Sequence, residues 1–218
     1  MRVLITGTSS GIGKGIADKF LKEGHYVTGI DRKESNIQHN CYTHISMDIR
    51  DKVHYPELEP FDIVINNAGV QNEEDIDINL KGTIHITEKY GIHPGIRAVL
   101  MIGSASGHNG SEFPEYVASK GGVLSYTKNV ALRIAKYGAT CNSLDFGGVL
   151  TELNRPVMED EKLWNEIMEQ TPLKRWMTVE EAADWTHFMT VTNRFCTGQN
   201  ILIDGLEAGN AHFVWPEE

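Results

Sequence analysis

A glycine-rich turn near the start of the chain constrains the fold more than any other feature. The segment Thr6–Gly13 reads T-G-T-S-S-G-I-G and lies between an apolar run, Arg2–Thr6, and apolar residues at helical spacing. Gly7 permits a tight turn, and Gly11 and Gly13 let the backbone approach a phosphate while the helix packs on the strand. The N-terminus of that helix offers free N–H groups to an anion. An ordinary flexible turn is the alternative interpretation, but it explains three glycines at one strand-to-helix junction less well.

Short apolar runs alternate with helical patterns along the rest of the chain. The predicted strands are Arg2–Thr6, Tyr26–Ile30, Tyr42–Ser46, Phe61–Asn66, Arg97–Ser104, Ala139–Phe146 and Asn200–Asp204. Most of these runs are continuously apolar, which is typical of parallel strands that are buried on both faces. This alternation predicts an α/β fold, a three-layer doubly wound parallel sheet of about seven strands with helices on both faces. Its ligand site is expected at the carboxyl ends of the strands.

Three helices have clear sequence signals. The first follows the glycine turn and stops at Gly24, and a long second helix runs from Pro114 to Gly138. For the third, Thr178 is the expected N-cap and Glu181 completes a capping box. Its buried side is predicted to consist of Ala182, Trp185 and Met189.

Composition excludes several classes of protein. The 218 residues fit a single domain, residues 1–218, and the formal charge of −10 disfavours binding to nucleic acid. No run of 18 apolar residues occurs, so no membrane span is expected. Three widely spaced cysteines without a CxxC motif indicate free thiols and a cytoplasmic protein. The histidines show no metal-binding spacing, so no metal site is predicted.

The second predicted strand ends at an acid that bears on the choice of cofactor. Asp31 follows Gly13 by 18 residues, and an acid at about this distance binds ribose hydroxyls and repels a 2′-phosphate. Arg32 is able to grip such a phosphate, but Ser10 supplies no second cation in the turn. The sequence therefore favours NAD(H) over NADP(H), although Asp31 also fits a turn-forming acid.

A tyrosine and a lysine share one face of the long helix. Tyr116 and Lys120 are four residues apart, so their side chains point the same way. A nearby cation lowers the pKa of a tyrosine from about 10, which makes a general acid/base that works near neutral pH. Ser104 ends a predicted buried strand 12 residues earlier. The plainer interpretations are a small strand-end residue at Ser104 and a solvated helical charge at Lys120.

Together these motifs resemble the short-chain dehydrogenase/reductase family. The resemblance runs nearly end to end and rests on Thr6–Gly13, Asp48, Asn66–Gly69, Asn79, Ser104, Tyr116, Lys120 and later segments at residues 172–175, 180–181, 197–199 and 204–205. It implies a Rossmann-like fold and an NAD(H)-dependent oxidoreductase. Such an enzyme transfers a hydride between the nicotinamide and a small alcohol or carbonyl substrate.

The resemblance also implies the role of each site residue. Tyr116 would exchange the proton, Lys120 would lower its pKa and hold the nicotinamide ribose, and Ser104 would hydrogen-bond the substrate oxygen. Asn79 would position a water that links Lys120 to solvent. Asp48 and Ile49 would frame the adenine, and Val149 and Thr151 would meet the carboxamide. The full cofactor-binding set is Gly7, Ser10, Gly11, Ile12, Gly13, Asp31, Asp48, Ile49, Asn67, Ala68, Gly69, Tyr116, Lys120, Val149 and Thr151.

The chain departs from the family pattern between Asp48 and Asn79. Only nine residues separate Gly69 from Asn79, so a helix that the family usually has there is expected to be missing or reduced to a turn, and the crossover helix before Asn66 to be a stub. This shortening motivates the alternative hypothesis of a non-catalytic dinucleotide-binding sensor or scaffold.

Three further expectations concern the substrate side and assembly. Residues 150–171 are expected to form a substrate lid, although core packing also explains their apolar residues. His108, Asn109 and Glu112 are candidates for the pocket rim, or ordinary loop residues. The family's habit implies a homo-oligomer, either a dimer or a tetramer.

Overall fold

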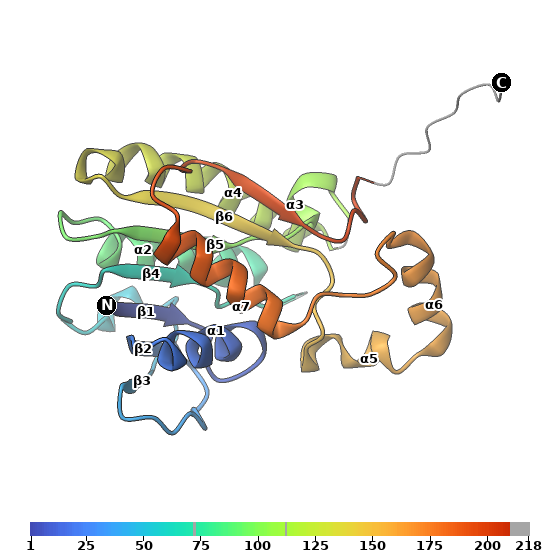
Figure 1. Ribbon diagram of the computed structural model, residues 1–218, viewed down its shortest axis with the longest axis horizontal. Coiled ribbons are helices and arrows are strands. Elements are labelled where there is room, and N and C mark those ends of the chain that lie inside the picture. The colour runs from blue at the N-terminus through green and yellow to red at the C-terminus, as the bar shows by residue number, and fades with distance from the viewer. Residues whose placement is uncertain (72, 112, 210–218) are drawn as a thin grey trace.

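Seven parallel strands form one sheet in the computed structural model, which describes residues 1–71, 73–111 and 113–209 (Figure 1). The strands lie in the order β3-β2-β1-β4-β5-β6-β7. Their bounds are β1 Arg2–Thr6, β2 Tyr26–Asp31, β3 Tyr42–Ser46, β4 Ile63–Asn66, β5 Ala98–Ile102, β6 Thr140–Phe146 and β7 Asn200–Ile203. Every predicted strand is present, and the observed bounds differ from the predicted ones by at most two residues at either end. The predicted doubly wound sheet is confirmed.

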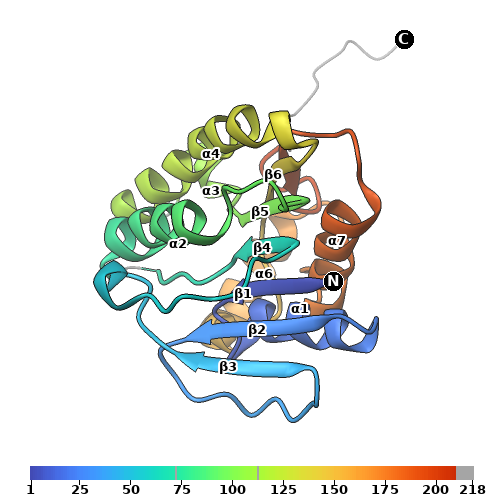
Figure 2. The ribbon, with the colours of Figure 1, turned by 90° about the vertical axis from the view of Figure 1, so that its left-hand side faces the viewer.

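Helices cover both faces of this sheet (Figure 2). On one face lie α1 (Gly11–Lys22) and α7 (Val179–His187), and on the other lie α2 (Thr83–Tyr90) and α4 (Pro114–Ile134). Because side chains alternate along a strand, Val3 and Ile5 join the core under α1 and α7, whereas Leu4 joins the core on the opposite face. The other three α-helices of the described residues are α3 (Ser106–Asn109), α5 (Arg155–Met158) and α6 (Glu161–Gln170).

The helix signals of the sequence hold with one exception. Gly24 and Gly138 follow the ends of their helical segments with φ of +79° and +72°, and Thr178 and Glu181 form both hydrogen bonds of the capping box. The exception is Trp185, which was predicted to be buried but is 39% exposed. Its ring packs edge-on against Phe188 at 6.4 Å between centroids, so the indole lies at the margin of the core.

The shortened region has the form that the sequence predicts. Between β3 and β4 the only helical structure is a 3₁₀ turn, Lys52–His54. The described residues between Gly69 and Asp75 contain no helix, and a π-helical segment, Ile76–Gly82, leads directly into α2. Within the described ranges, no helix is both long enough and apolar enough to cross a membrane.

Candidate active site

The glycine turn forms a cradle of bare backbone at the N-terminus of α1. Gly7 has a φ of +78°, and a Cβ at Gly13 would lie 2.1 Å from the carbonyl oxygen of Gly7. Only glycine fits Gly13 without displacing that backbone. The first turn of α1 carries no acidic residue, and no side chain caps its N-terminus. The free N–H groups and the positive end of the helix dipole therefore suit an anion such as a phosphate group.

The segment after β4 packs directly on this cradle. The Asn67 side chain donates to the Thr6 and Gly7 carbonyls at 3.0 and 3.3 Å, and the backbone N–H groups of Asn67 and Ala68 donate to the Thr6 hydroxyl. On the other side, a Cβ at Gly11 would lie 3.7 Å from a methyl carbon of Thr151. The fold thus brings the predicted cofactor residues of three separate segments to one place.

Tyr116 and Lys120 lie together at the start of α4. The Lys120 Nζ is 5.6 Å from the centroid of the Tyr116 ring. Lys120 is only 6% exposed and donates to the Ile102 carbonyl at 3.0 Å, at the end of β5. Ser104 follows two residues later and is also buried; its hydroxyl lies 2.9 Å from that of Ser106. An ammonium group is therefore held beside the phenol, with the serine hydroxyl nearby at the end of the adjoining strand.

Asn79 is fixed more firmly than its shortened surroundings suggest. It is 1% exposed, its side-chain oxygen accepts from the Val70 N–H at 2.8 Å, and its amide donates to the Val70 carbonyl, Asp75 and Ser119 at 2.9, 3.1 and 3.2 Å. Ser119 in turn donates to the Tyr116 carbonyl at 2.7 Å. Asn79 therefore ties the loop after β4 to the helix that carries Tyr116.

Asp31 stands where the second strand meets the glycine turn. Its carboxylate accepts from the N–H groups of Ser9 at 3.0 Å and Lys33 at 2.9 Å. Each carboxylate oxygen has further acceptor capacity, so ribose hydroxyls remain compatible with these bonds. The adjacent Arg32 is exposed and lies close enough to Asp48 for its charge to lower the pKa of that carboxyl.

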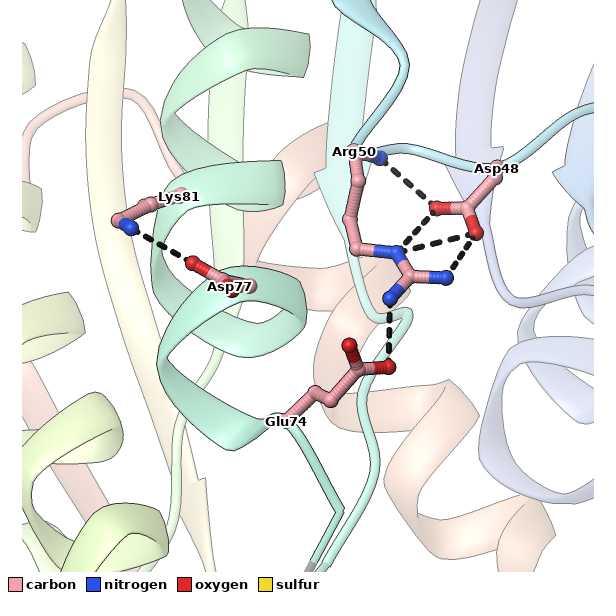
Figure 3. A network of polar contacts seen from close by, with 5 residues as sticks. All are labelled: Asp48, Arg50, Glu74, Asp77 and Lys81. Carbon is pink, nitrogen blue, oxygen red and sulfur yellow. Dashed lines mark hydrogen bonds and ion pairs between the residues drawn. The ribbon is translucent and has the colours of Figure 1, made fainter.

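A network of partly exposed ion pairs joins Asp48, Arg50 and Glu74. We call these three residues and Asp31 the adenine end of the site, after the role that the family resemblance implies for Asp48. Figure 3 shows the Arg50 guanidinium between Asp48 and Glu74, with N–O distances of 2.6 and 2.5 Å. Hydrogen bonds from Arg50 are the main reason that the pKa of Asp48 lies below its usual value. Glu74 adopts a φ of +48°, which is unusual for a residue with a side chain. The ion pairs therefore link the segment after β3 to the loop that precedes Asn79.

Val149 and Ile49, two further predicted cofactor residues, are both buried. Val149 forms an isolated parallel bridge with Met177. Ile49 accepts a hydrogen bond from the Tyr55 hydroxyl through its carbonyl, and its side chain fills the space that a Cβ at Gly82 would need. Ser10 is the N-cap residue of α1, and Ile12 lies in its first turn. Glu112, a candidate for the pocket rim, lies outside the described residues.

The sequence interpretation missed two buried acids near this site. Asp75 is 2% exposed and holds Asn79. Asp145 on β6 is fully buried and pairs with His108 on α3 at 2.7 Å. The signal for Asp145 was available, because a charged residue inside a strand that is buried on both faces requires a partner. No group of three metal-ligating side chains occurs in the part of the chain that the structure describes.

Comparison with known proteins identifies the family. The short chain dehydrogenase model matches residues 1–162, most of the chain. The chain belongs to the short-chain dehydrogenase family. It is 27% identical to the 3-oxoacyl-[acyl-carrier-protein] reductase of Staphylococcus epidermidis and 28% identical to the D-beta-hydroxybutyrate dehydrogenase of Rhizobium meliloti, in each case over 93% of this chain and 96% of the relative.

A solved structure agrees with this assignment. The aldohexose dehydrogenase of Thermoplasma acidophilum superposes with a TM-score of 0.86 at 25% identity, over 99% of this chain and 97% of that one. Members of the short-chain dehydrogenase family are oxidoreductases that act on alcohol and keto groups with a nicotinamide cofactor, and this chain is an enzyme of that kind.

Proposed function

We propose that this short-chain dehydrogenase is an NAD(H)-dependent enzyme that interconverts a small secondary alcohol and its carbonyl compound, with Tyr116 as the general acid/base. The position of the Lys120 ammonium, 5.6 Å from the centre of the Tyr116 ring, is the observation that carries the proposal. A cation at this distance stabilises phenolate over phenol, so it lowers the pKa of the tyrosine toward the working range of an acid/base catalyst.

The residues of the chain suit a dinucleotide. The glycine cradle and the start of α1 would hold the pyrophosphate, Asp31 the adenosine ribose, and Asp48 and Ile49 the adenine. Asn67, Ala68 and Gly69 would line the groove, and Val149 and Thr151 would lie at the carboxamide. When bound, the nicotinamide supplies the hydride chemistry.

Side chains of α4 and of the segment that follows β5 transfer the proton and bind the substrate oxygen. In carbonyl reduction, Tyr116 donates its proton to the oxygen as negative charge develops there, and Ser104 donates a hydrogen bond to the same oxygen. In alcohol oxidation, Tyr116 accepts the proton. Lys120 keeps its ammonium beside the phenol because its Nζ is anchored on the Ile102 carbonyl, and Asn79 holds the start of α4 through Ser119.

The choice of NAD(H) over NADP(H) follows from the charges at the adenine end. A 2′-phosphate at Asp31 would meet a carboxylate, whereas Arg32 is flanked by the acids Asp31 and Asp48. Fluorescence titration is expected to give a lower Kd for NADH than for NADPH. In the variant Asp31→Ser this preference is expected to shrink or reverse. A wild-type protein that binds NADPH more tightly would contradict the role of Asp31.

Turnover tests the central proposal. The relatives named above act on a 3-oxoacyl group and on hydroxybutyrate, so a panel of secondary alcohols, 3-hydroxy acids and their ketones is appropriate, with NADH absorbance as the readout. Tyr116→Phe is expected to reduce kcat at least 100-fold. The exposed Tyr26→Phe is the matched control and is expected to retain full activity. Full activity of Tyr116→Phe would exclude this mechanism, and tight NADH binding without turnover would favour a sensor or scaffold.

We also propose that residues 150–171 form the substrate lid. In Figure 1, α5 and α6 project beyond the carboxyl edge of the sheet, and none of their residues is buried. Trp164 of α6 packs edge-on against Trp176 at 5.0 Å between ring centroids. Trp164→Ala is expected to raise KM more than it lowers kcat, because it loosens the lid without touching Tyr116 or Lys120.

A homo-oligomer and a cytoplasmic location complete the proposal. Trp185 on α7 and Phe188 just after it pack together and expose apolar surface, which suits a self-complementary contact. Light scattering is expected to give at least a dimer, and a monomer would refute this point. The three cysteines are free thiols, as suits a reducing compartment.

A further inference from the structure

A buried acid and an imidazole lie next to the strand end that leads to Ser104. The Asp145 side chain is 0% exposed, and its carboxylate oxygen lies 2.7 Å from the His108 Nε2. The His108 side chain is 30% exposed, so the imidazole extends from the buried carboxylate to solvent. Burial is the main reason that the pKa of Asp145 lies above its usual value, and the imidazole acts against this effect.

The backbone around this pair shows that its position is tightly defined. A Cβ at Gly103, the residue before Ser104, would lie 1.8 Å from the Asp145 carboxylate oxygen. A Cβ at Gly107 would lie 3.1 Å from the carbonyl carbon of Lys120. Glycine at these two positions lets α3 and the end of β5 close around the carboxylate. The pair is therefore in fixed contact with the strand end that carries Ser104 and with the helix that carries Lys120.

Few other polar or charged groups face Asp145. On α4, Lys120 lies close enough for its charge to lower the pKa of Asp145, and the Ser143 hydroxyl on β6 acts in the same direction. The neighbouring strands β5 and β7 contribute no titratable side chain, and Asp145 stands in register with Leu202 of β7. Among the residues that the structure describes, His108 and Lys120 are the titratable groups that act on Asp145.

We propose that Asp145 and His108 are positioning residues that oppose the electrostatic effect of Lys120 on Tyr116, so that the Tyr116 phenol stays protonated to a higher pH than it would with the lysine alone. His108 keeps Asp145 ionised by donating to it, and the anion partly cancels the effect of the ammonium on the phenol. The result favours carbonyl reduction at neutral pH, because Tyr116 remains protonated until the pH rises further. This inference rests on the role proposed for Tyr116, but its test needs no substrate.

Spectrophotometric titration of tyrosinate tests the pair. For the wild type and for each variant, subtracting the titration curve of the same protein with Tyr116→Phe gives the titration of Tyr116. In Asp145→Asn, which keeps the side-chain shape, the titration midpoint of Tyr116 is expected to fall by about 1 pH unit, as removal of one charge at the edge of the site predicts. Asp184→Asn removes an exposed acid on α7 and is the matched control, with no expected shift.

Substitution of His108 tests the second half of the pair. His108→Leu removes the donor, so Asp145 takes up a proton and the Tyr116 midpoint is expected to fall as in Asp145→Asn. His108→Gln retains an N–H donor and is expected to restore the wild-type midpoint. If Asp145→Asn and Asp184→Asn titrate alike, the proposal is wrong, and an unchanged midpoint in His108→Leu would remove His108 from it. A protein that shows these shifts but no turnover would refute the proposed function and not this inference.

Discussion

The two ends of the proposed cofactor groove are built in opposite ways. At the catalytic end, Asn79, Ser104 and Lys120 are buried, and Asn79 and Lys120 are tied by hydrogen bonds to backbone groups of the core. At the adenine end, Asp48 and Arg50 are about a third exposed and Glu74 is 60% exposed, and their links are ion pairs. Both ends are polar, but only at the first are these polar side chains buried.

This difference has consequences for energy and for function. A buried polar group that loses its partner carries an uncompensated desolvation cost, whereas an exposed ion pair exchanges its partner for water at little cost. The catalytic end is therefore expected to be rigid and intolerant of substitution. The adenine end is expected to tolerate change and to respond to salt.

The largest expected effect is at Asn79. Asn79→Ala removes the hydrogen bonds that the Asn79 side chain makes with the Val70 backbone, Asp75 and Ser119. The free energy of unfolding is expected to fall by about 3 kcal/mol. Urea denaturation measures this change. Asn129→Ala, an exposed substitution of the same type on α4, is the control and is expected to change stability by less than about 0.5 kcal/mol. Equal effects at the two sites would remove the contrast between the buried and exposed regions.

The second prediction concerns Asp48 and Asp145, whose pKa values are shifted in opposite directions. Asp48 has a lowered pKa, so its contribution to stability is full above the unfolded value of about 3.9 and is lost as the pH falls through the folded value. Asp145 has a raised pKa, so its contribution is full below about 3.9 and is lost as the pH rises through the folded value.

Urea denaturation across pH measures both effects. Relative to Asp48→Asn, the wild type is expected to gain stability with rising pH in the acid range and then level off. Relative to Asp145→Asn, it is expected to lose stability as the pH rises above about 4. If both stability differences changed with pH in the same direction, the expected contrast between the partly exposed Asp48 and the buried Asp145 would be wrong.

Sequence and structure agree best where local rules are strong. The glycine turn, the capping box at Thr178 and the continuously apolar strands each specify their own local geometry, so the doubly wound sheet was predictable. The spacing of Tyr116 and Lys120 placed both groups on one helix face, because that geometry depends only on the helical period.

The features that the sequence did not predict depend on contacts between distant segments. The pair Asp145–His108 joins residues 37 apart, and Arg50 meets Glu74 across 24 residues. Trp185 was placed on the buried side because helical periodicity identifies a face but not the width of the core that covers it. Such contacts depend on the tertiary structure, which the hydrophobic periodicity of the sequence does not specify.

A smaller effect is expected from the ion pairs of the adenine end. Arg50→Ala removes the links to both Asp48 and Glu74. The free energy of unfolding is expected to fall by less than about 1 kcal/mol, and by less still in 0.5 M NaCl, because salt screens exposed charges. Urea denaturation at two salt concentrations measures both values. A loss as large as that of Asn79→Ala, or one that salt does not reduce, would mean that this network is as structural as the catalytic end.

The smallest expected effect on stability is that of Glu74→Gly, which distinguishes the cost of backbone strain at Glu74 from the contribution of its ion pair. The φ of +48° at Glu74 favours glycine, so Glu74→Gly relieves backbone strain. The same substitution removes the bond to Arg50. With Arg50 present, these two effects on stability are expected to cancel almost completely. In the Arg50→Ala background the ion pair is already absent. There, Glu74→Gly is expected to stabilise the protein by about 0.5 kcal/mol in urea denaturation. Equal effects in both backgrounds would show that Arg50 does not hold Glu74 in this conformation, and the loop before Asn79 would then owe its shape to Asp75 and Val70 alone.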